Sequence, residues 1–279
     1  MIDTLYVTDL DGTLLRGDKV VPPRSVEILR GLIGQGAAVT VASARSAISV
    51  RMLNLGEVGF RLPMILMNGV LLYDYASDRI LDCCAWEENT LAAVLDVCAT
   101  AGKPPFLFGV EDGKLHIQYR CPTSEGERIF IEERMRQDPG AFRRVERYSL
   151  QNGVYISMQD RRDVVESIRD RLTEIPGVDC VLYSDAYLGD NWYLEAFSTQ
   201  AGKANGVRRL RERLGARRVV AFGDNLNDLG MLAQADLACV VANGEPKAIA
   251  AADRLVGRND EDGVAAFILE DWQERVTMR

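Results

Sequence analysis

The sequence predicts an α/β protein, in which a doubly wound, Rossmann-like core with a parallel sheet is interrupted by an inserted α+β domain. Three observations predict this fold. Strand-like and helix-like segments alternate at the start of the chain, a mixed pattern with hairpin-like strands follows, and the alternation returns toward the C-terminus. We therefore expect the core in residues 1–83 and 194–279 and the inserted domain, or cap, in residues 84–193. A chain of 279 residues is long enough for two domains of ordinary size.

The first core segment begins with a short apolar run, Thr4–Thr8, which predicts a buried strand that stops at Asp9. Pro22 and Pro23 then introduce an amphipathic helix that ends near Gly34–Gly36. The segment continues with a strand at Ala37–Ala42, a helix through Ile48 and Leu53, and a strand at Leu62–Met67.

The cap alternates helices with strands that we expect to be antiparallel. A hairpin around Ala76–Asp78 leads into a helix near Thr90–Thr100, strands near Lys114–Tyr119 and Val154–Met158, a helix at Asp163–Ile175 and a strand at Val178–Tyr183. The core then resumes with a helix at Ala204–Leu214, a strand at Arg218–Phe222, a helix at Asp228–Gln234, a strand at Leu237–Val241 and a helix at Pro246–Ala252.

The composition excludes several kinds of protein. Acidic residues outnumber basic ones, 41 to 33, so a nucleic-acid partner is not expected. A membrane partner is not expected either, because no apolar run approaches the length of a membrane span. The single histidine, His116, makes a histidine-based triad or a multi-histidine metal site hard to build. The six cysteines include no C-x-x-C pair and lie mostly in apolar runs, which predicts a reduced, cytoplasmic protein.

Two carboxylates stand at the end of the first predicted strand. Asp9 and Asp11 are two residues apart, so they project from the same face of an extended chain. Ligands bind at the carboxyl ends of strands in open α/β sheets, and close carboxylates repel unless a cation or a proton joins them. The alternative interpretation is a solvated Asp-Gly turn with Thr13 as a helix cap.

Three other strand ends or helix starts carry polar side chains. Asp224, Asn227 and Asp228 follow an apolar strand, although Asp228 would also be favourable as a first-turn acid. Ser43 and Arg45 follow the strand Ala37–Ala42, where Ser43 suits an anion or serves as a plain N-cap. Lys203 precedes a helix; a lone lysine there is usually a surface residue. Together, these acids, a hydroxyl and a cation suit a bound Mg²⁺ with a phosphate beside it.

The chain resembles the haloacid dehalogenase-like (HAD) phosphohydrolases, in the Cof-type branch with a type IIB inserted cap. Four motifs carry the resemblance, in order: Asp9-Leu-Asp11-Gly-Thr-Leu-Leu, Ser43, Lys203 and Gly223-Asp224-Asn-Leu-Asn227-Asp228. Two further matching stretches are Met67-Asn68-Gly69-Val70 and the segment from Ala242-Asn243-Gly244 to Asp262-Gly263-Val264. The match is specific in both core segments and weak in the cap.

The resemblance implies a two-step phosphatase that acts on a small phosphorylated metabolite, with a sugar phosphate as the expected class. Asp9 would attack phosphorus to form an aspartyl-phosphate, and Asp11 would serve as acid and then as base. Ser43 would bind a phosphoryl oxygen, and Lys203 would balance charge. The implied Mg²⁺ ligands are Asp9, the Asp11 main-chain carbonyl and Asp224, with Asp228 beside them.

The resemblance also implies substrate-binding roles for Arg45, Asn68, Gly69 and Asn227. The second motif, usually Thr-Gly-Arg in this branch, is here Ser43-Ala44-Arg45; serine keeps the hydroxyl, and an exposed helix-start arginine is the alternative role for Arg45. Two other functions remain open: a phosphomutase or phosphotransferase that uses the same aspartyl-phosphate, and a non-catalytic phosphometabolite-binding protein.

The cap would close over the site and determine specificity. Five of its residues are candidates for substrate contact, although packing or surface exposure is the better interpretation of each: Arg120, Tyr183, Asp185, Asn191 and Trp192. For His116 we expect a structural or solvated role away from the chemistry.

Overall fold

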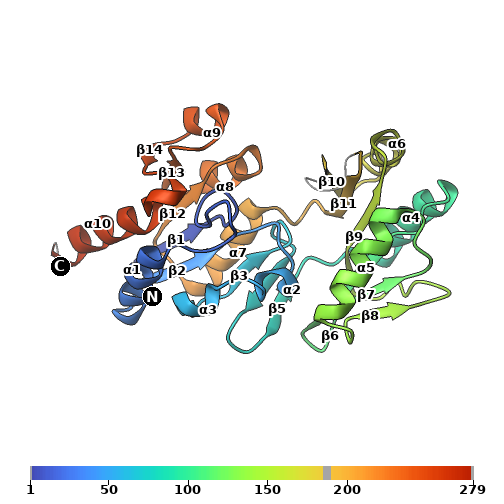
Figure 1. Ribbon diagram of the computed structural model, residues 1–279, viewed down its shortest axis with the longest axis horizontal. Coiled ribbons are helices and arrows are strands. Elements are labelled where there is room, and N and C mark those ends of the chain that lie inside the picture. The colour runs from blue at the N-terminus through green and yellow to red at the C-terminus, as the bar shows by residue number, and fades with distance from the viewer. Residues whose placement is uncertain (1, 185–189, 278–279) are drawn as a thin grey trace. The chain divides into compact units, whose positions relative to one another are not determined.

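The computed structural model describes residues 2–184 and 190–277 and divides the chain into two units (Figure 1). The first unit comprises the residues up to Asp82 and those from Ala201 onward, and the second comprises Cys83–Gln200. The predicted fold class, a parallel α/β core with an inserted α+β unit, is confirmed.

A five-stranded parallel sheet forms the centre of the first unit, in the order β14-β13-β12-β1-β2. Its strands are β1 (Thr4–Thr8), β2 (Ala38–Val41), β12 (Arg218–Gly223), β13 (Leu237–Val241) and β14 (Arg254–Val256). Every residue of β1 is buried, because this strand lies between β12 and β2. The chain continues from β1 to β2 on one side of β1, and β12, β13 and β14 lie on the other side of β1. The strand order therefore reverses beside β1, where open α/β sheets bind ligands.

Apolar residues at helical spacing form the buried faces of the helices in this unit, and proline or glycine marks some of the helix ends. They are α1 (Pro23–Gly34), α2 (Ala47–Val50), α3 (Leu55–Val58), α7 (Lys203–Leu214), α8 (Leu229–Gln234), α9 (Pro246–Ala250) and α10 (Gly263–Thr277). Helix α1 starts on Pro23 and buries Val26, Leu29 and Leu32. Gly215, with φ of 62°, ends α7 in the left-handed conformation that glycine adopts readily.

The strand expected at Leu62–Met67 does not continue the parallel sheet. Strand β3 (Met64–Leu66) pairs antiparallel with β4 (Leu71–Asp74), and β5 (Arg79–Cys83) completes a separate three-stranded sheet. One parallel bridge, from Ala42 to Ile65, links β3 to the end of β2. The reason is local: residues 67–69 all have positive φ, between 50° and 84°, so the chain turns back tightly after β3. The helix expected through Ile48 and Leu53 is likewise divided into α2 and α3.

In its described residues, the second unit is a six-stranded sheet with three helices; the strand order is β10-β11-β9-β6-β7-β8. Its strands are β6 (Phe106–Glu111), β7 (Lys114–Tyr119), β8 (Phe142–Arg144), β9 (Gly153–Asp160), β10 (Val178–Ser184) and β11 (Trp192–Ser198). Its helices are α4 (Glu88–Thr100), α5 (Glu125–Gln137) and α6 (Arg162–Leu172). The pairs are antiparallel, as expected, except for the parallel pair β7 and β8.

The expected boundary between residues 193 and 194 lies inside β11. Leu194 to Phe197 pair with both β9 and β10, so these residues belong to the inserted unit, which extends to Gln200. The other boundary moves by one residue, since Cys83 also belongs to the inserted unit.

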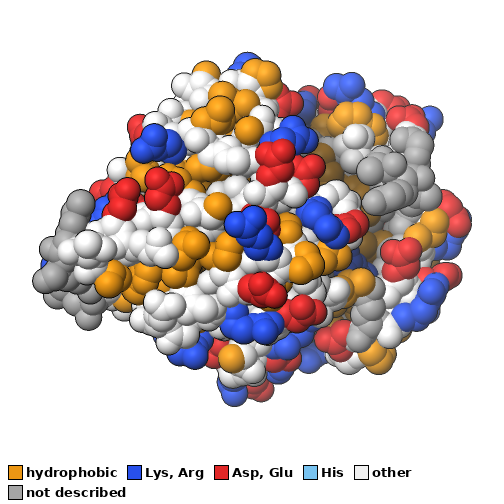
Figure 2. Space-filling model, turned by 60° about the vertical axis from the view of Figure 1, so that its left-hand side comes forward, with side chains coloured by type: hydrophobic (Ala, Val, Ile, Leu, Met, Phe, Trp, Pro, Cys, Tyr) orange, Lys and Arg blue, Asp and Glu red, His pale blue; other side chains and the backbone are white. Residues whose placement is uncertain are grey.

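Charged side chains of both signs are mixed on the surface. On the face shown in Figure 2, Lys and Arg side chains are interspersed with Asp and Glu side chains.

Within residues 2–184 and 190–277, no helix combines the length and the apolar character needed to cross a bilayer.

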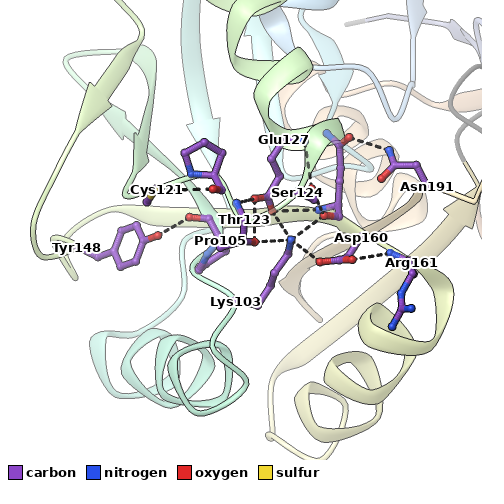
Figure 3. A network of polar contacts seen from close by, with 12 residues as sticks. Lys103, Pro105, Cys121, Thr123, Ser124, Glu127, Tyr148, Asp160, Arg161 and Asn191 are labelled. Carbon is purple, nitrogen blue, oxygen red and sulfur yellow. Dashed lines mark hydrogen bonds and ion pairs between the residues drawn. The ribbon is translucent and has the colours of Figure 1, made fainter.

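A buried lysine joins α5 to the end of β9 in the inserted unit (Figure 3). Lys103 Nζ donates to Thr123 Oγ1 at 2.6 Å, to the Gln159 carbonyl at 2.8 Å and to Asp160 Oδ2 at 2.8 Å. It also lies 3.0 Å from Glu127 Oε1, and both side chains of this ion pair are at most 3% exposed. Such a pair does not by itself add much stability, but removing one member leaves the other charge buried and unpaired.

We expect Lys103→Met to destabilise the inserted unit by about 3–5 kcal/mol, because Glu127 would lose its buried cation. Lys114→Met, at an exposed position of β7, is the control. Hydrogen exchange of the α5 and β9 amides reports the change locally. Equal exchange rates in the two variants would show that Lys103 does not hold these elements together.

Asp271 links α10 to the central sheet. Its Oδ2 accepts hydrogen bonds from Tyr6 Oη at 2.7 Å, Arg218 Nη1 at 2.8 Å and Arg275 Nε at 3.0 Å. Burial alone would raise the pKa of Asp271, but the hydrogen bonds from Arg218 and Tyr6 and the Arg218 charge hold it below its ordinary value.

A carboxylate with a lowered pKa stabilises the fold above its ordinary pKa and loses this effect as the pH falls through the folded-state value. Asp271→Asn should therefore cost about 2 kcal/mol near neutral pH, and the difference from the native chain should shrink as the pH falls below about 4. Denaturant unfolding across this range measures the difference. The control is Asp260→Asn, whose exposed pair with Arg258 should contribute less than about 1 kcal/mol; a pH-independent difference for Asp271→Asn would contradict the assignment.

Candidate active site

Asp9, the first carboxylate of the site, directly follows the central strand β1. The amide of Asp9 donates to the Phe222 carbonyl at 2.9 Å, so pairing between β1 and β12 continues one residue beyond Thr8. Asp9 is 5% exposed. Asp224 follows the last residue of β12, and the two acids therefore meet at the carboxyl ends of adjacent strands, as predicted.

Lys203 joins Asp9 to Asp228. Its Nζ lies 2.6 Å from Asp9 Oδ1 and 2.7 Å from Asp228 Oδ1, and all three side chains are buried. Burial would lower the pKa of Lys203, but the charges of the two carboxylates hold that pKa above its ordinary value, so the ammonium stays protonated. Lys203 is therefore a buried cation at the first position of α7, not a surface residue.

Asp228 also fixes the turn that carries Asp224. Its Oδ2 accepts hydrogen bonds from the amides of Asp224 and Asn225, both at 3.1 Å. Gly223 makes room for this arrangement, because a Cβ at that position would lie 2.6 Å from the Asp228 Cβ. Both oxygens of Asp228 are thus engaged in positioning other groups.

The loop after β1 holds the Asp224 carboxylate from the other side. Thr13 Oγ1 donates to Asp224 Oδ1 at 2.9 Å, so Thr13 serves this acid and is not a helix cap. Gly12 has φ of 84°, and a Cβ there would lie 2.4 Å from Asp224 Oδ2. The close approach of backbone and carboxylate at this point requires glycine.

Three carboxylates, those of Asp9, Asp224 and Asp228, offer oxygens within 4.8 Å of one another. With Lys203 as their buried ion-pair partner, they carry excess negative charge. Burial raises the pKa of Asp9 to about 7; the Lys203 charge opposes this shift, and the Asp228 charge adds to it. Burial also raises the pKa of Asp224, against the hydrogen bond from Thr13. Carboxylate oxygens that are buried in Asp9 and Asp228 and half-buried in Asp224, with excess negative charge, fit a hard divalent cation such as Mg²⁺.

Asp11 is not one of the three acids of this cluster, and its carboxylate is paired with other residues. Its carboxylate accepts two hydrogen bonds from Arg45, both at 2.7 Å, and one from Lys19 at 3.0 Å. Burial would raise the pKa of Asp11, but Arg45 and Lys19 together hold it below its ordinary value. Arg45 is only partly exposed, so its side chain forms part of the site.

A turn with left-handed backbone conformation at residues 67–69 connects three more of the predicted site residues, Ser43, Asn68 and Gly69. The amide of Asn68 donates to the Ser43 carbonyl at 3.1 Å, and the Asn68 carbonyl accepts from the Gly202 amide at 2.7 Å. A Cβ on Gly69 would lie 2.1 Å from the Gly202 carbonyl oxygen, so this contact also requires glycine. The turn therefore ties the loop after β2 to the start of α7. Ser43 is buried and does not cap α2, whose N-cap is Ser46.

Several contacts that support the site were not predicted from the sequence. Lys19 reaches Asp11 from an exposed loop with no motif around it. Asn243 donates to the Gly12 carbonyl at 2.8 Å and accepts from the Asn259 amide at 2.9 Å, which fixes the Gly12 loop. Asn227, predicted to bind substrate, is exposed on the turn between β12 and α8.

The cap candidates have different surroundings. Arg120 is exposed, Trp192 packs under the Arg162 guanidinium at 4.8 Å, and Asn191 donates to Gln159 Oε1 at 3.0 Å. Tyr183 donates to Glu195 Oε1 at 2.8 Å, and Asp185 lies outside the described residues. His116 is buried on β7 in the inserted unit, whereas the carboxylate cluster lies in the first.

Gly12→Ala should weaken Mg²⁺ binding about tenfold or more, because the new Cβ would displace Asp224 Oδ2. Gly36→Ala is a matched control, since Gly36 also has positive φ, 99°, but nothing lies within 4 Å of its added Cβ. Both variants share the backbone strain, of about 1–2 kcal/mol, and only the first has the clash. Calorimetric titration with Mg²⁺ compares them, and equal affinities would argue against a cation site at Asp224.

Comparison with known proteins agrees with this geometry. The family model for haloacid dehalogenase-like hydrolases matches residues 6–268. The 5-amino-6-(5-phospho-D-ribitylamino)uracil phosphatase YitU of Bacillus subtilis (strain 168) is 23% identical over 286 aligned residues, which cover 95% of this chain and 96% of the relative. The pyridoxal phosphate phosphatase YbhA of Escherichia coli (strain K12) is 23% identical over 282 aligned residues, which cover 96% and 98% of the two chains.

A solved structure shares the fold. The HAD subclass IIB sugar phosphatase BT4131 matches with a TM-score of 0.68 and 19% identity, over 95% of this chain and 97% of the other. The family match extends over both core segments, which hold Asp9, Lys203 and Asp224. The chain belongs to the haloacid dehalogenase-like hydrolases and is a phosphatase of that superfamily.

Proposed function

We propose that this chain is a Mg²⁺-dependent phosphatase that hydrolyses a small phosphorylated metabolite, with a sugar phosphate as the expected class, through an aspartyl-phosphate on Asp9. One observation carries the proposal: the Asp9 carboxylate is buried at the end of the central strand and is held at 2.6 Å by a buried lysine, next to two further acids. Such a carboxylate is oriented for attack, and its charge is balanced in a site shielded from water.

Asp9 is the nucleophile of the proposed reaction. Its attack on phosphorus breaks the bond to the leaving oxygen and forms the acyl phosphate. Lys203 holds Oδ1 of Asp9 and supplies positive charge beside the transferred phosphoryl group. Mg²⁺, held by Asp9, Asp224 and the Asp11 main-chain carbonyl, would offset the remaining negative charge so that a phosphate can approach. Asp228 keeps Lys203 and the Asp224 turn in place beside that cation.

Asp11 is the proposed acid and base. Its protonated carboxyl gives a proton to the leaving alkoxide, and its carboxylate then takes a proton from the water that hydrolyses the acyl phosphate. The pairing with Arg45 and Lys19 holds the ionised form, which is the base of the second step. For the first step, Arg45 would leave Asp11 and pair with the phosphoryl group, which weakens the stabilisation of the ionised form and lets Asp11 carry the proton that it donates. Arg45 can donate two parallel hydrogen bonds to a phosphoryl group in the same way as it does to Asp11.

The other predicted residues support phosphate binding. Ser43 would donate its hydroxyl to a phosphoryl oxygen, and the Asn68-Gly69 turn would position the loop that carries Ser43. We propose a substrate-binding role for exposed Asn227 as well, and we propose that the inserted unit determines specificity.

Asp9→Asn should reduce hydrolysis of p-nitrophenyl phosphate by on the order of 10³-fold or more, because the amide cannot act as nucleophile. Asp18→Asn, which removes an exposed carboxylate paired with Arg16, is the control and should retain activity. A chelator should abolish activity in the native chain, and added Mg²⁺ should restore it. Substantial turnover by Asp9→Asn, or by chelated protein, would refute the mechanism.

A further inference from the structure

Lys19 lies at a loop position that usually carries glycine. The Arg16 amide donates to the Val20 carbonyl at 3.0 Å, and the Lys19 amide donates to the Arg16 carbonyl at 3.0 Å. This is the pattern of a three-residue hairpin loop, whose last residue adopts the left-handed conformation and is typically glycine. Lys19 takes that place, with φ of 64°. Strained residues of this kind persist where the surrounding structure holds them, and they cluster at functional sites.

The loop is anchored where it rejoins the core of the first unit. Val21 is fully buried, its amide donates to Asn54 Oδ1 at 3.0 Å, and its carbonyl accepts from Asn54 Nδ2 at 3.4 Å. Asn54 directly precedes α3. The exposed loop is therefore held to the core at this end, and the Lys19 side chain has a defined position beside Asp11.

Lys19 and Arg45 hold the Asp11 carboxylate in different ways. Arg45 donates from Nε to Oδ2 and from Nη2 to Oδ1, whereas Lys19 Nζ donates to Oδ1 alone, at 3.0 Å. The Lys19 side chain is 50% exposed, and exposed ion pairs contribute little to stability. Stability therefore does not explain why a lysine occupies a position that favours glycine.

We propose that Lys19 is a positioning residue, which holds Oδ1 of Asp11 while Arg45 binds the phosphoryl group. This inference rests on the proposed phosphatase function. When Arg45 moves to the phosphoryl group, Oδ2 of Asp11 loses its donor, and Lys19 keeps Oδ1 in place. Oδ2 then gives its proton to the leaving alkoxide in the first step and takes a proton from the attacking water in the second. Lys19 thus orients the proton transfer, and Arg45 contributes to phosphate affinity.

The test is Lys19→Gly, which removes the side chain and suits the left-handed backbone. This variant should unfold at a denaturant concentration close to that of the native chain, because glycine adopts this conformation without strain. Its kcat for p-nitrophenyl phosphate with Mg²⁺ should nevertheless fall about tenfold or more, whereas KM and the inhibition constant of inorganic phosphate should change less than about twofold. Lys19→Arg, which keeps a cationic donor, should restore most of kcat, and Lys19→Met should not.

Asp112→Gly is the matched control. Asp112 also has positive φ, 51°, in an exposed loop, and it lies in the inserted unit between β6 and β7. The substitution makes the same change of backbone preference without removing a partner of Asp11, so kcat should not change. Arg45→Met should instead raise KM and the inhibition constant of inorganic phosphate.

Failure of the inference can be distinguished from failure of the proposed function. If the native chain does not hydrolyse p-nitrophenyl phosphate with Mg²⁺, or if Asp9→Asn retains activity, the proposed function fails and the inference falls with it. If the native chain is active through Asp9 but Lys19→Gly retains its kcat, only the inference is overturned. A loss of kcat that Lys19→Arg does not restore would also overturn it, because the loop and not the cation would then be responsible.

Discussion

The active site depends on the buried ion pairs that Lys203 makes with Asp9 and Asp228. Placing two buried carboxylates and a third, half-buried one at the end of a parallel sheet is unfavourable unless positive charge is buried with them. Lys203 supplies part of that charge from the first turn of α7, and it reaches both acids because α7 begins beside the carboxyl end of β1. The remaining negative charge is what makes the site suited to a divalent cation and then to a phosphate.

Several features far apart in the sequence serve this arrangement. Gly202 precedes Lys203 and donates its amide to the Asn68 carbonyl, so the left-handed turn after β3 determines where α7 starts. Asp228 holds the turn of Asp224, and Thr13 holds the Asp224 carboxylate. The reversal of strand order beside β1 brings these loops to one edge of the sheet.

The fold class and the central acids could be predicted from the sequence. Each depends on a local pattern of apolar residues and on the rule that the carboxyl ends of parallel strands meet at one edge of a sheet. Apolar β-branched runs indicated β1 and β12, and the acids directly after them had to meet at one sheet edge. Strand β3 could not be placed correctly, because positive φ at Met67 and Asn68 has no clear signal in residues other than glycine. The cap boundary was wrong by several residues, since a linker and the last residues of β11 look alike until pairing is known. The contacts of Thr13 and Lys19 were not predicted for the same reason: they depend on tertiary approach.

The central claim is that Asp9 becomes phosphorylated during turnover. The most direct measurement is acid quenching of the Mg²⁺-loaded native chain during steady-state hydrolysis, followed by mass spectrometry with fragmentation of the peptide that contains Asp9 and Asp11. The account predicts one added phosphoryl group, located on Asp9, which is absent in Asp9→Asn. A phosphoryl group on Asp11 or elsewhere, or rapid turnover under conditions where a stabilised acyl phosphate is never trapped, would contradict it.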